Sequence, residues 1–218
     1  MNNTGPFSSI AETYDRWYDE AEGAAIFAAE LACLQAAVPE LHGQWLEVGV
    51  GTGRFAHALG VANGIDPAPS MLALAARRNI RTTIGTAEEL PYAADSFDGV
   101  VMVAALCFVE HAPRALDECY RVTRPGGTLL LGHIPSDAPW GRSYTRKAAA
   151  GHPVYSHARF TTVVAVLAMA HRAGFQLQTA VSGLFWPPGS PPETPPQVKP
   201  GVIAGAGFVA LALGHSVT

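Results

Sequence analysis

The chain has 218 residues, of which 49% are hydrophobic and 15% are charged, so it can bury a sizeable core and is not a disordered polypeptide. Its formal net charge is −4, without any block of like charges, which argues against a nucleic-acid-binding surface or an anionic-membrane surface. Three cysteines without metal-ligand spacing, and an N-terminal segment without a secretory pattern, lead us to expect free thiols in the cytoplasm.

Short apolar strands and helices alternate through the middle of the sequence. The spacing of apolar residues first predicts a helix over 24–38, which Pro39 ends. After it we expect strands over 45–48, 61–66, 80–84, 97–106 and 126–134. Helices over 53–59, 69–78 and 113–123 lie between them. This alternation predicts an α/β domain with a parallel sheet and right-handed crossovers.

The C-terminal part departs from this alternation. After a loop, the pattern predicts a helix over 159–175 and strands over 176–185 and 208–215. Seven prolines lie between residues 187 and 200, and they predict an exposed loop outside the sheet. Two strands joined by a loop predict an antiparallel hairpin at the end of the sheet. We expect a single domain over 1–218.

A glycine-rich loop, "LEVGVGTGRFA" over 46–56, follows the first predicted strand. Ligands of open parallel sheets bind beyond the C-terminal ends of the strands, so this loop is the expected site. It lacks the Gly-Lys-Ser/Thr that a phosphate-binding P-loop requires. A dinucleotide site requires G-x-G-x-x-G, and here the third glycine comes one position early, although Asp66 lies 17 residues after Gly49. The dinucleotide interpretation is weakened and stays open.

S-adenosylmethionine is a third ligand class for this loop, because it carries an ammonium, a sulfonium and a ribose diol but no phosphate. The carboxylate of Glu47 can attract the cationic part or brace the loop amides. Asp66, at the end of the second strand, can accept both ribose hydroxyls, and Met71 can cover the adenine face. A tight turn without a ligand, and a helix N-cap at Asp66, remain the alternatives.

Four segments in order resemble class I S-adenosylmethionine-dependent methyltransferases, specifically the type-11 methyltransferase domain. They are "LEVGVGTGRFA", "GIDPAPSML", "GTAEELPYAADSFDGVVMVAAL" and "ALDECYRVTRPGGTLLLGHI", and they cover about residues 45–134; the segment 7–19 also resembles the family. The resemblance implies a Rossmann-like, doubly wound, mostly parallel seven-stranded sheet whose antiparallel C-terminal strand lies between the fifth and sixth strands. It divides the domain into an N-terminal helical extension or lid (1–40), a cofactor-binding core (45–134), and a substrate loop, helix and C-terminal hairpin (135–218).

The resemblance also implies S-adenosylmethionine as the cofactor and assigns its contacts. The residues expected on the methionine and ribose side are Glu47, Gly49, Gly51, Gly53 and Ala104. The residues expected at the ribose hydroxyls and the adenine are Asp66, Pro67, Met71, Thr86, Ala87 and Glu88. Tyr14, in the N-terminal segment, is our best candidate for a further cofactor contact. The family usually has an aspartate where Thr86 stands, so the Thr86 hydroxyl or Glu88 must accept from the adenine amino group.

We assign no catalytic residue from the sequence. The sulfonium is already a strong electrophile, so a base is needed only if the nucleophile arrives protonated. The candidates for acceptor contact or base are Cys107, His133, Tyr155 and His157, with core packing as the alternative for Cys107. The eight histidines show no ligand cluster, so we expect no metal.

These observations predict an S-adenosylmethionine-dependent methyltransferase that acts on a small-molecule acceptor by in-line methyl transfer. The chain lacks a basic stripe and a separate recognition domain, so we expect no nucleic acid and no membrane as partner. The alternative is a non-catalytic protein of the same fold that binds S-adenosylmethionine; a nicotinamide-dependent oxidoreductase is disfavoured by the glycine spacing. The sequence leaves the acceptor, the methylated atom and the oligomeric state open.

Overall fold

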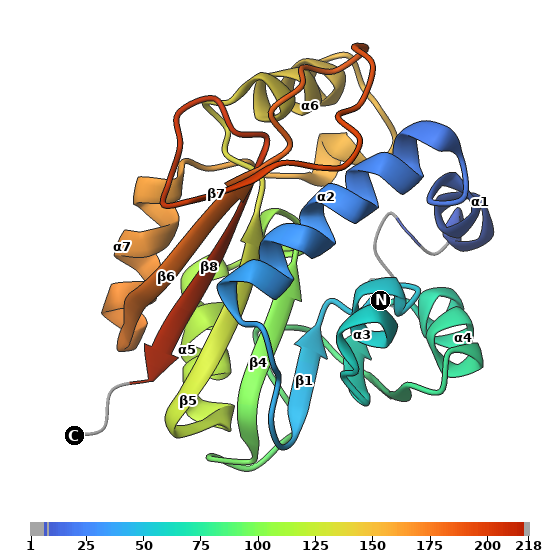
Figure 1. Ribbon diagram of the computed structural model, residues 1–218. Helices are drawn as coiled ribbons and strands as arrows, with labels where there is room; N and C mark the ends of the chain where they lie inside the picture. The colour runs from blue at the N-terminus through green and yellow to red at the C-terminus, as the bar shows by residue number, and fades with distance from the viewer. Residues whose placement is uncertain (1–6, 8, 216–218) are drawn as a thin grey trace.

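A computed structural model describes residues 7 and 9–215 and contains one eight-stranded sheet covered by helices on both faces (Figure 1). The strand order is β3-β2-β1-β4-β5-β8-β6-β7. The strands are β1 (Trp45–Val48), β2 (Asn63–Asp66), β3 (Arg81–Ile84), β4 (Phe97–Val103), β5 (Thr123–His133), β6 (Phe175–Gly183), β7 (Val198–Pro200) and β8 (Phe208–His215). The order reverses at β1, which is the switch point where such sheets bind ligands.

The sheet is parallel over its first five strands and becomes antiparallel at β8. β1 pairs in parallel with β2 and β4, and β4 pairs in parallel with β5. β8 runs antiparallel to both β5 and β6, between which it lies. The predicted fold class, an α/β sheet with an antiparallel C-terminal strand inserted before the sixth, is therefore confirmed.

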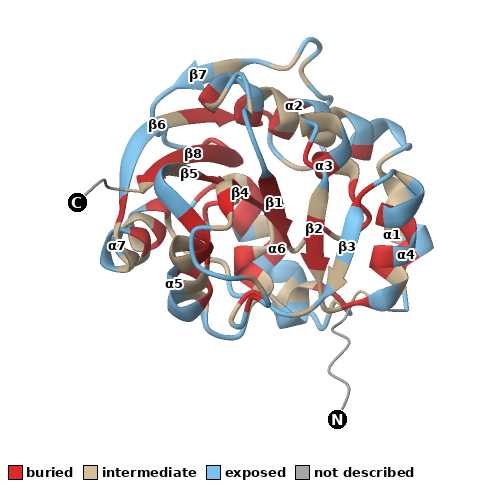
Figure 2. Ribbon diagram, turned by 90° about the horizontal axis from the view of Figure 1, so that it is seen from below, coloured by how far each residue is buried: buried red, intermediate tan, exposed pale blue. Residues whose placement is uncertain are grey.

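Successive residues of the strands point to opposite faces of the sheet and belong to two apolar cores, one on each face. Trp45, Val101 and Leu130 belong to the core under α2 (Ala21–Ala37), α3 (Arg54–Leu59) and α4 (Pro69–Arg77). Leu46, Val100 and Leu129 belong to the core under α5 (Ala112–Val122) and α7 (Val163–Ala173). Figure 2 shows the buried central strands between these two layers of helices. Burial on both faces explains why the central strands β1, β4 and β8 read as nearly continuous apolar runs.

Three sequence-based expectations need correction. The strand predicted over 97–106 ends at Val103, because Ala104 adopts a left-handed φ of 48° and a short 3-10 helix, η1 (Leu106–Phe108), follows. The loop predicted over 187–200 contains β7, which makes the sheet eight-stranded rather than seven-stranded. β7 pairs only with β6 at the edge of the sheet, where proline is tolerated.

The third correction concerns a helix inside a predicted loop. α6 (Pro139–Ala149) follows β5, and a second 3-10 helix, η2 (Tyr155–His157), comes before α7. Trp140 and Tyr144 of α6 are buried against the core that contains α2. These elements lie above the C-terminal ends of the parallel strands, at the level of the expected ligand site (Figure 1).

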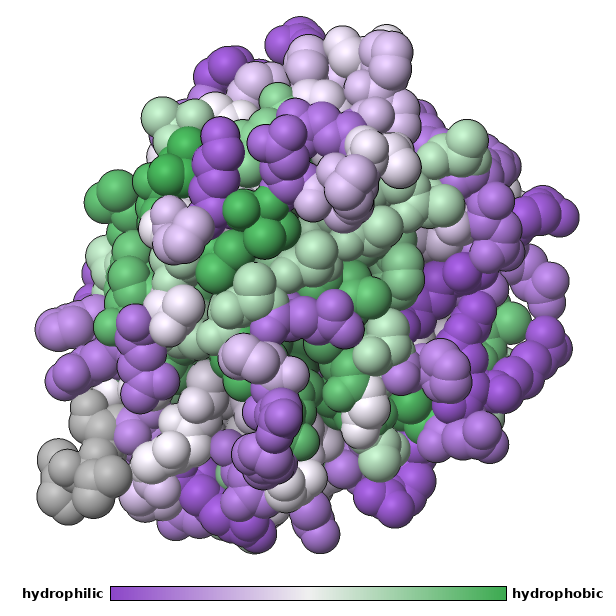
Figure 3. All heavy atoms as spheres, viewed as in Figure 1, coloured by the Kyte–Doolittle hydropathy of each residue, from purple (hydrophilic) through white to green (hydrophobic). Residues whose placement is uncertain are grey.

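The helix α2 is apolar around most of its circumference. Ile26, Cys33 and Leu34 are buried against the sheet, whereas the exposed positions include Ala24 and Ala28. Figure 3 shows a green and pale green apolar band across the face of the molecule on which α2 lies in Figure 1. Alanine has the highest helix propensity, so it keeps the outer side of α2 helical without a bulky apolar surface. None of the helices in the described residues is long and apolar enough to cross a membrane.

The N-terminal helix α1 (Ala11–Trp17) is held by ion pairs to the elements around the glycine loop. Asp15 accepts hydrogen bonds from Arg54 Nε on α3 and from Arg78 Nη2, the C-cap of α4, both at 2.9 Å. Arg78 also donates to the Thr52 carbonyl oxygen at 2.9 Å, and Arg54 pairs with Asp19. Partial burial opposes ionisation of Asp15, but the bonds from Arg54 and Arg78 prevail and lower its pKa to about 2.

Asp15→Asn should therefore detach α1 and lower the free energy of unfolding at pH 7 by about 1–2 kcal/mol, the scale of charge-assisted hydrogen bonds that stay partly solvated. The lowered pKa means that the contribution is fully present above the unfolded-state pKa near 4 and is lost as the pH falls towards 2. Urea unfolding at pH 7 and in acid measures this, with the exposed Asp117→Asn as control. Equal losses in the two variants would contradict the anchoring role.

Candidate functional site

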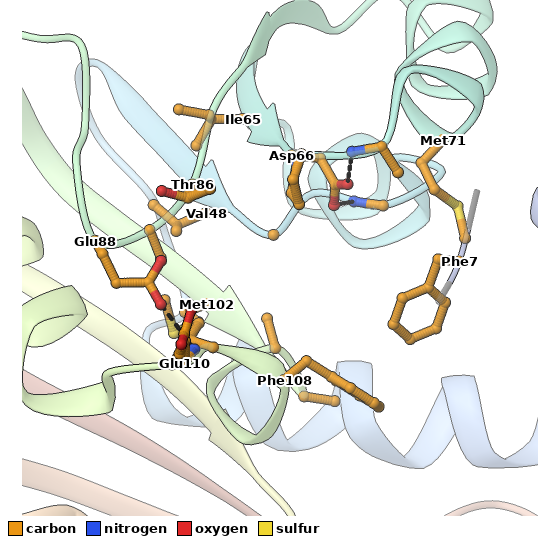
Figure 4. A pocket seen from close by; sticks show the side chains of 18 of the residues that line it. Phe7, Val48, Ile65, Asp66, Met71, Thr86, Glu88, Met102, Phe108 and Glu110 are labelled. Carbon is orange, nitrogen blue, oxygen red and sulfur yellow. Dashed lines mark hydrogen bonds between the residues drawn. The ribbon is translucent and has the colours of Figure 1, made fainter. Parts of the chain in front are cut away.

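A cavity of about 550 Å³ opens at the C-terminal ends of β1, β2 and β4. Ten of the twelve residues predicted to hold the cofactor line it: Tyr14, Gly49, Gly51, Asp66, Pro67, Met71, Thr86, Ala87, Glu88 and Ala104. Figure 4 shows the side chains of three different strand-end loops pointing into this space. The volume lies within the range of small-molecule and cofactor sites.

The glycine loop has two glycines with different physical roles. Gly51 has a φ of 52° and lines the cavity, and a Cβ there would meet no atom within 4 Å, so only a ligand could use the space. Gly53 does not line the cavity; a Cβ there would lie 3.0 Å from the Ala75 backbone on α4. Gly51 leaves room beside the backbone, and Gly53 lets α3 and α4 pack closely.

The carboxylate of Asp66 is fixed by two backbone amides, which is visible as dashed lines in Figure 4. Its Oδ2 accepts from the Gly51 amide at 3.0 Å, and its Oδ1 accepts from the Ala68 amide at 2.9 Å. Burial raises the pKa of Asp66, while these two amides oppose the shift. Each oxygen keeps a further lone pair, so the group can act as a fixed two-pronged acceptor at the cavity wall.

Glu47 is a buried acid with an unpaired oxygen. It lines a small cavity of about 40 Å³ that also touches Tyr14, Gly51 and Ala104, and its Oε2 is buried without a hydrogen-bond partner. Burial raises the pKa of Glu47 well above its usual value, while the Ala56 amide lowers it and the charge of Asp66 raises it. An unsatisfied buried acceptor costs about 1–3 kcal/mol, so a donor at this point would be strongly favoured.

The opposite end of the cavity has apolar walls and a polar edge. Val48, Ile65, Met71 and Met102 line the walls. At the edge, the Glu88 carboxylate is partly engaged, because its Oε1 accepts from the backbone amide of Glu110 at 2.8 Å and from the next amide at 3.2 Å. Glu88 therefore braces the segment after η1, and the Thr86 hydroxyl is the freer polar group at this edge.

Aromatic side chains cover the cavity from the N-terminal segment. The ring of Phe7 makes edge contacts with Tyr14, at 5.5 Å between centroids, and with Phe108, at 4.9 Å. Tyr14 in turn shares a hydroxyl contact of 3.0 Å with Tyr18. The sequence singled out Tyr14 but not Phe7 or Phe108. Phe7 opens the segment 7–19, in which Ser8 lies outside the described residues.

The four candidates for acceptor contact or base lie in different surroundings. His157 lines the cavity, whereas Cys107, His133 and Tyr155 do not. The Cys107 thiol donates to the Ala104 carbonyl oxygen at 3.3 Å, and burial raises its pKa to about 12, so it stays a thiol at neutral pH. The ring of His133 is buried with Nε2 2.9 Å from the Thr161 carbonyl oxygen, and burial lowers its pKa. Within residues 7 and 9–215, no group of three or more His, Cys, Asp and Glu side chains could hold a metal ion.

Comparison with known proteins places these features in a family. The family described as "Methyltransferase domain" matches residues 46–131. An uncharacterized protein of Mycobacterium tuberculosis is 37% identical over 202 residues, which are 93% of this chain and 71% of the relative. An uncharacterized protein of Methanocaldococcus jannaschii is 33% identical over 82% of this chain and 85% of the relative.

A solved structure from Thermotoga maritima is similar over almost the whole chain. It is described as an S-adenosylmethionine-dependent methyltransferase and possible histamine N-methyltransferase, and it has a TM-score of 0.88, 32% identity, and coverage of 97% of this chain and 98% of its own. The predicted methyltransferase family, enzyme class and cofactor are thus confirmed. The chain belongs to the S-adenosylmethionine-dependent methyltransferases.

Proposed function

We propose that the protein transfers a methyl group in line from S-adenosylmethionine to a small-molecule acceptor, with the cofactor lying across the cavity from Glu47 to Thr86. The observation that carries this placement is the buried, unpaired Oε2 of Glu47 beside the glycine loop. In this proposal residues 45–134 hold the cofactor, residues 1–40 close over it, and residues 135–218 contact the acceptor, within one domain.

The residues present fit the two polar ends of the cofactor. The ammonium of its methionine part would donate to Glu47 Oε2 and satisfy that acceptor. The ribose diol would donate to the two oxygens of Asp66, which the amides of Gly51 and Ala68 already hold in a fixed orientation. Met71 and Ile65 would pack on the adenine, whose amino group would reach the Thr86 hydroxyl.

The chain's own contribution to the reaction is orientation and exclusion of water. When bound, S-adenosylmethionine supplies a methyl group on a sulfonium, which is already an activated electrophile. Phe7, Tyr14 and Phe108 would shield it from water, and the ring faces would favour its positive charge. Of the four candidates for acceptor contact, His157 is the one that lines the cavity.

Charge and similarity support a small acceptor. The net charge of −4 and the lack of a basic stripe disfavour polyanionic acceptors. The similar Thermotoga maritima protein is described as a possible histamine N-methyltransferase, and histamine is a small molecule. The three cysteines are buried free thiols, which suits a reducing cytoplasm.

Asp66→Ala should weaken binding of both S-adenosylhomocysteine and methylthioadenosine, because both ligands carry the ribose diol. We expect a loss of about 1.5–3 kcal/mol, the range for hydrogen bonds to a charged group. Isothermal titration calorimetry measures the two dissociation constants, and Asp117→Asn, at an exposed position on α5, is the control. Unchanged dissociation constants would mean that the diol binds elsewhere.

Glu47→Gln should weaken the binding of S-adenosylhomocysteine by a similar amount, because this ligand carries the ammonium. It should leave the binding of methylthioadenosine, which lacks the ammonium, unchanged. The same titrations provide the measurement, and the pair of ligands separates a lost contact from a damaged fold. An equal loss of affinity for both ligands would instead indicate that Glu47 only supports the glycine loop.

Labelled methyl groups should appear in small molecules. We expect that cell extract incubated with the enzyme and methyl-labelled S-adenosylmethionine carries the label in its small-molecule fraction, since the chain lacks a surface for polyanions. Mass spectrometry of the small-molecule, nucleic-acid and protein fractions is the readout, with Asp66→Ala as the blank. Enzyme-dependent label in RNA or protein would overturn the small-molecule proposal.

A further inference from the structure

Arg54 is a cation at the wall of the small cavity, and the proposed placement of the cofactor does not yet use it. It directly follows the glycine loop and lines the cavity of about 40 Å³ together with Glu47, Tyr18 and Gly51. Its side chain is 17% exposed. A charge that is partly withdrawn from water interacts more strongly with a ligand group of opposite charge than an exposed charge does.

The guanidinium of Arg54 is held in position from two sides. Its Nε donates to Asp15 Oδ1 at 2.9 Å, and its Nη2 donates to the Asp15 carbonyl oxygen at 2.7 Å. Its Cζ lies 5.5 Å from the ring centroid of Tyr18, which also lines the small cavity. These contacts fix the planar group at the cavity wall before a ligand arrives, and so reduce the entropy that binding costs.

Asp19 is the exchangeable partner of Arg54. Its carboxylate pairs with Nη1 at 2.9 Å and with Nη2 at 3.0 Å. The Asp19 side chain is 65% exposed, and Arg54 is its only ion-pair partner within the described residues. Asp15, by contrast, is 17% exposed and is also held by Arg78. Because an ion pair with a solvated partner is weak, a ligand carboxylate can take the place of Asp19 while Asp15 keeps α1 anchored.

The small cavity therefore has an unpaired acceptor and a charged donor on its wall. Glu47 Oε2 is buried without a hydrogen-bond partner, and Arg54 pairs with Asp15 and Asp19 rather than with Glu47. A ligand with an ammonium and a carboxylate on one carbon atom, an α-amino acid group, matches both side chains at once. A volume of about 40 Å³ has room for about three water-sized groups, which is the size of a carboxylate.

The small cavity adjoins the large one. Five residues line both cavities: Tyr14, Gly49, Gly51, Val103 and Ala104. An amino acid group in the small cavity can therefore belong to the same molecule as a ribose at Asp66 in the large cavity.

We propose that Arg54 binds the carboxylate of the methionine part of S-adenosylmethionine, and that this carboxylate takes the place of Asp19. The proposal rests on the proposed function, because it names a further binding residue for the same cofactor. With Glu47 at the ammonium and Arg54 at the carboxylate, the site recognises a complete amino acid rather than an amine. A sulfonium compound without the carboxylate leaves Arg54 paired with Asp19, as in the free protein, and so gains nothing from this contact.

Two ligands that differ only in the carboxylate test this proposal. They are S-adenosylhomocysteine and its decarboxylated counterpart, S-adenosyl-3-thiopropylamine, and both are titrated calorimetrically. Wild-type protein should bind S-adenosylhomocysteine at least about tenfold more tightly, a difference of one charge-assisted contact. Arg54→Met, which keeps an unbranched side chain and removes the charge, should bind the two ligands alike.

Arg78→Met is the matched control, because Arg78 also pairs with Asp15, at 2.9 Å, but is not among the residues that line the small cavity. This variant loosens α1 without touching the proposed contact, so it should keep the wild-type preference for S-adenosylhomocysteine. Glu47→Gln should weaken both ligands by the same factor and also keep the preference, because both ligands carry the ammonium.

Asp19→Asn tests the exchange in the opposite direction. Without the competing charge, S-adenosylhomocysteine should bind about two- to fivefold more tightly, the range for a solvated ion pair, and the decarboxylated ligand should bind as before. Glu20→Gln is the control, at an exposed acid whose side chain makes no cap hydrogen bond, and should bind both ligands as wild-type protein does. This variant pair also tests the proposal if Arg54→Met does not fold.

The proposal is wrong if wild-type protein binds the two ligands equally, if Arg54→Met keeps the preference, or if Arg78→Met loses it. An unchanged affinity of Asp19→Asn for S-adenosylhomocysteine would contradict the exchange of Asp19 for the ligand carboxylate. Failure of wild-type protein to bind either ligand would instead refute the proposed function.

Discussion

The hydrogen bonds from the Gly51 and Ala68 amides to the Asp66 carboxylate are the contacts on which the site depends. They join the loop after β1 to the loop after β2, beside the point between β1 and β4 where the strand order reverses. Because the two strands are parallel and adjacent, their C-terminal loops open on the same side of the sheet. One carboxylate therefore fixes the shape of the glycine loop and presents its remaining lone pairs to the cavity.

The same loop also anchors the cover of the cavity. Arg54 is the first residue of α3, directly after the glycines, and it holds Asp15 on α1, while Arg78 bridges Asp15 and the carbonyl of Thr52. The helix that brings Tyr14 over the cavity is thus tied to the loop that shapes its floor. Loss of the ion pairs would displace an aromatic cover without opening either core, since α1 contributes little to them.

The sequence predicted what short-range patterns determine. β1 and β8 begin and end at the predicted residues, because each is a strong apolar run next to a glycine, with Gly49 after β1 and Gly207 before β8. α6 was missed, since "PWGRSYTRKAA" combines a proline, a glycine and polar residues, and the burial of Trp140 and Tyr144 in the apolar core, which stabilises the helix, depends on tertiary contacts. β7 was missed because its pairing with β6 depends on tertiary context that overrides the prolines.

The residues of the site also fall into those that short-range sequence patterns predict and those that depend on tertiary contacts. Asp66 and Gly51 follow from position relative to a strand end, whereas Phe7 and Phe108 act only through contacts between distant segments. Glu47 is a third kind of case, a strand residue whose burial raises the pKa of its carboxyl group well above its usual value. Glu47 Oε2 is buried without a hydrogen-bond partner, so the protein loses stability at the point where the ammonium group of the cofactor would bind in the proposed function.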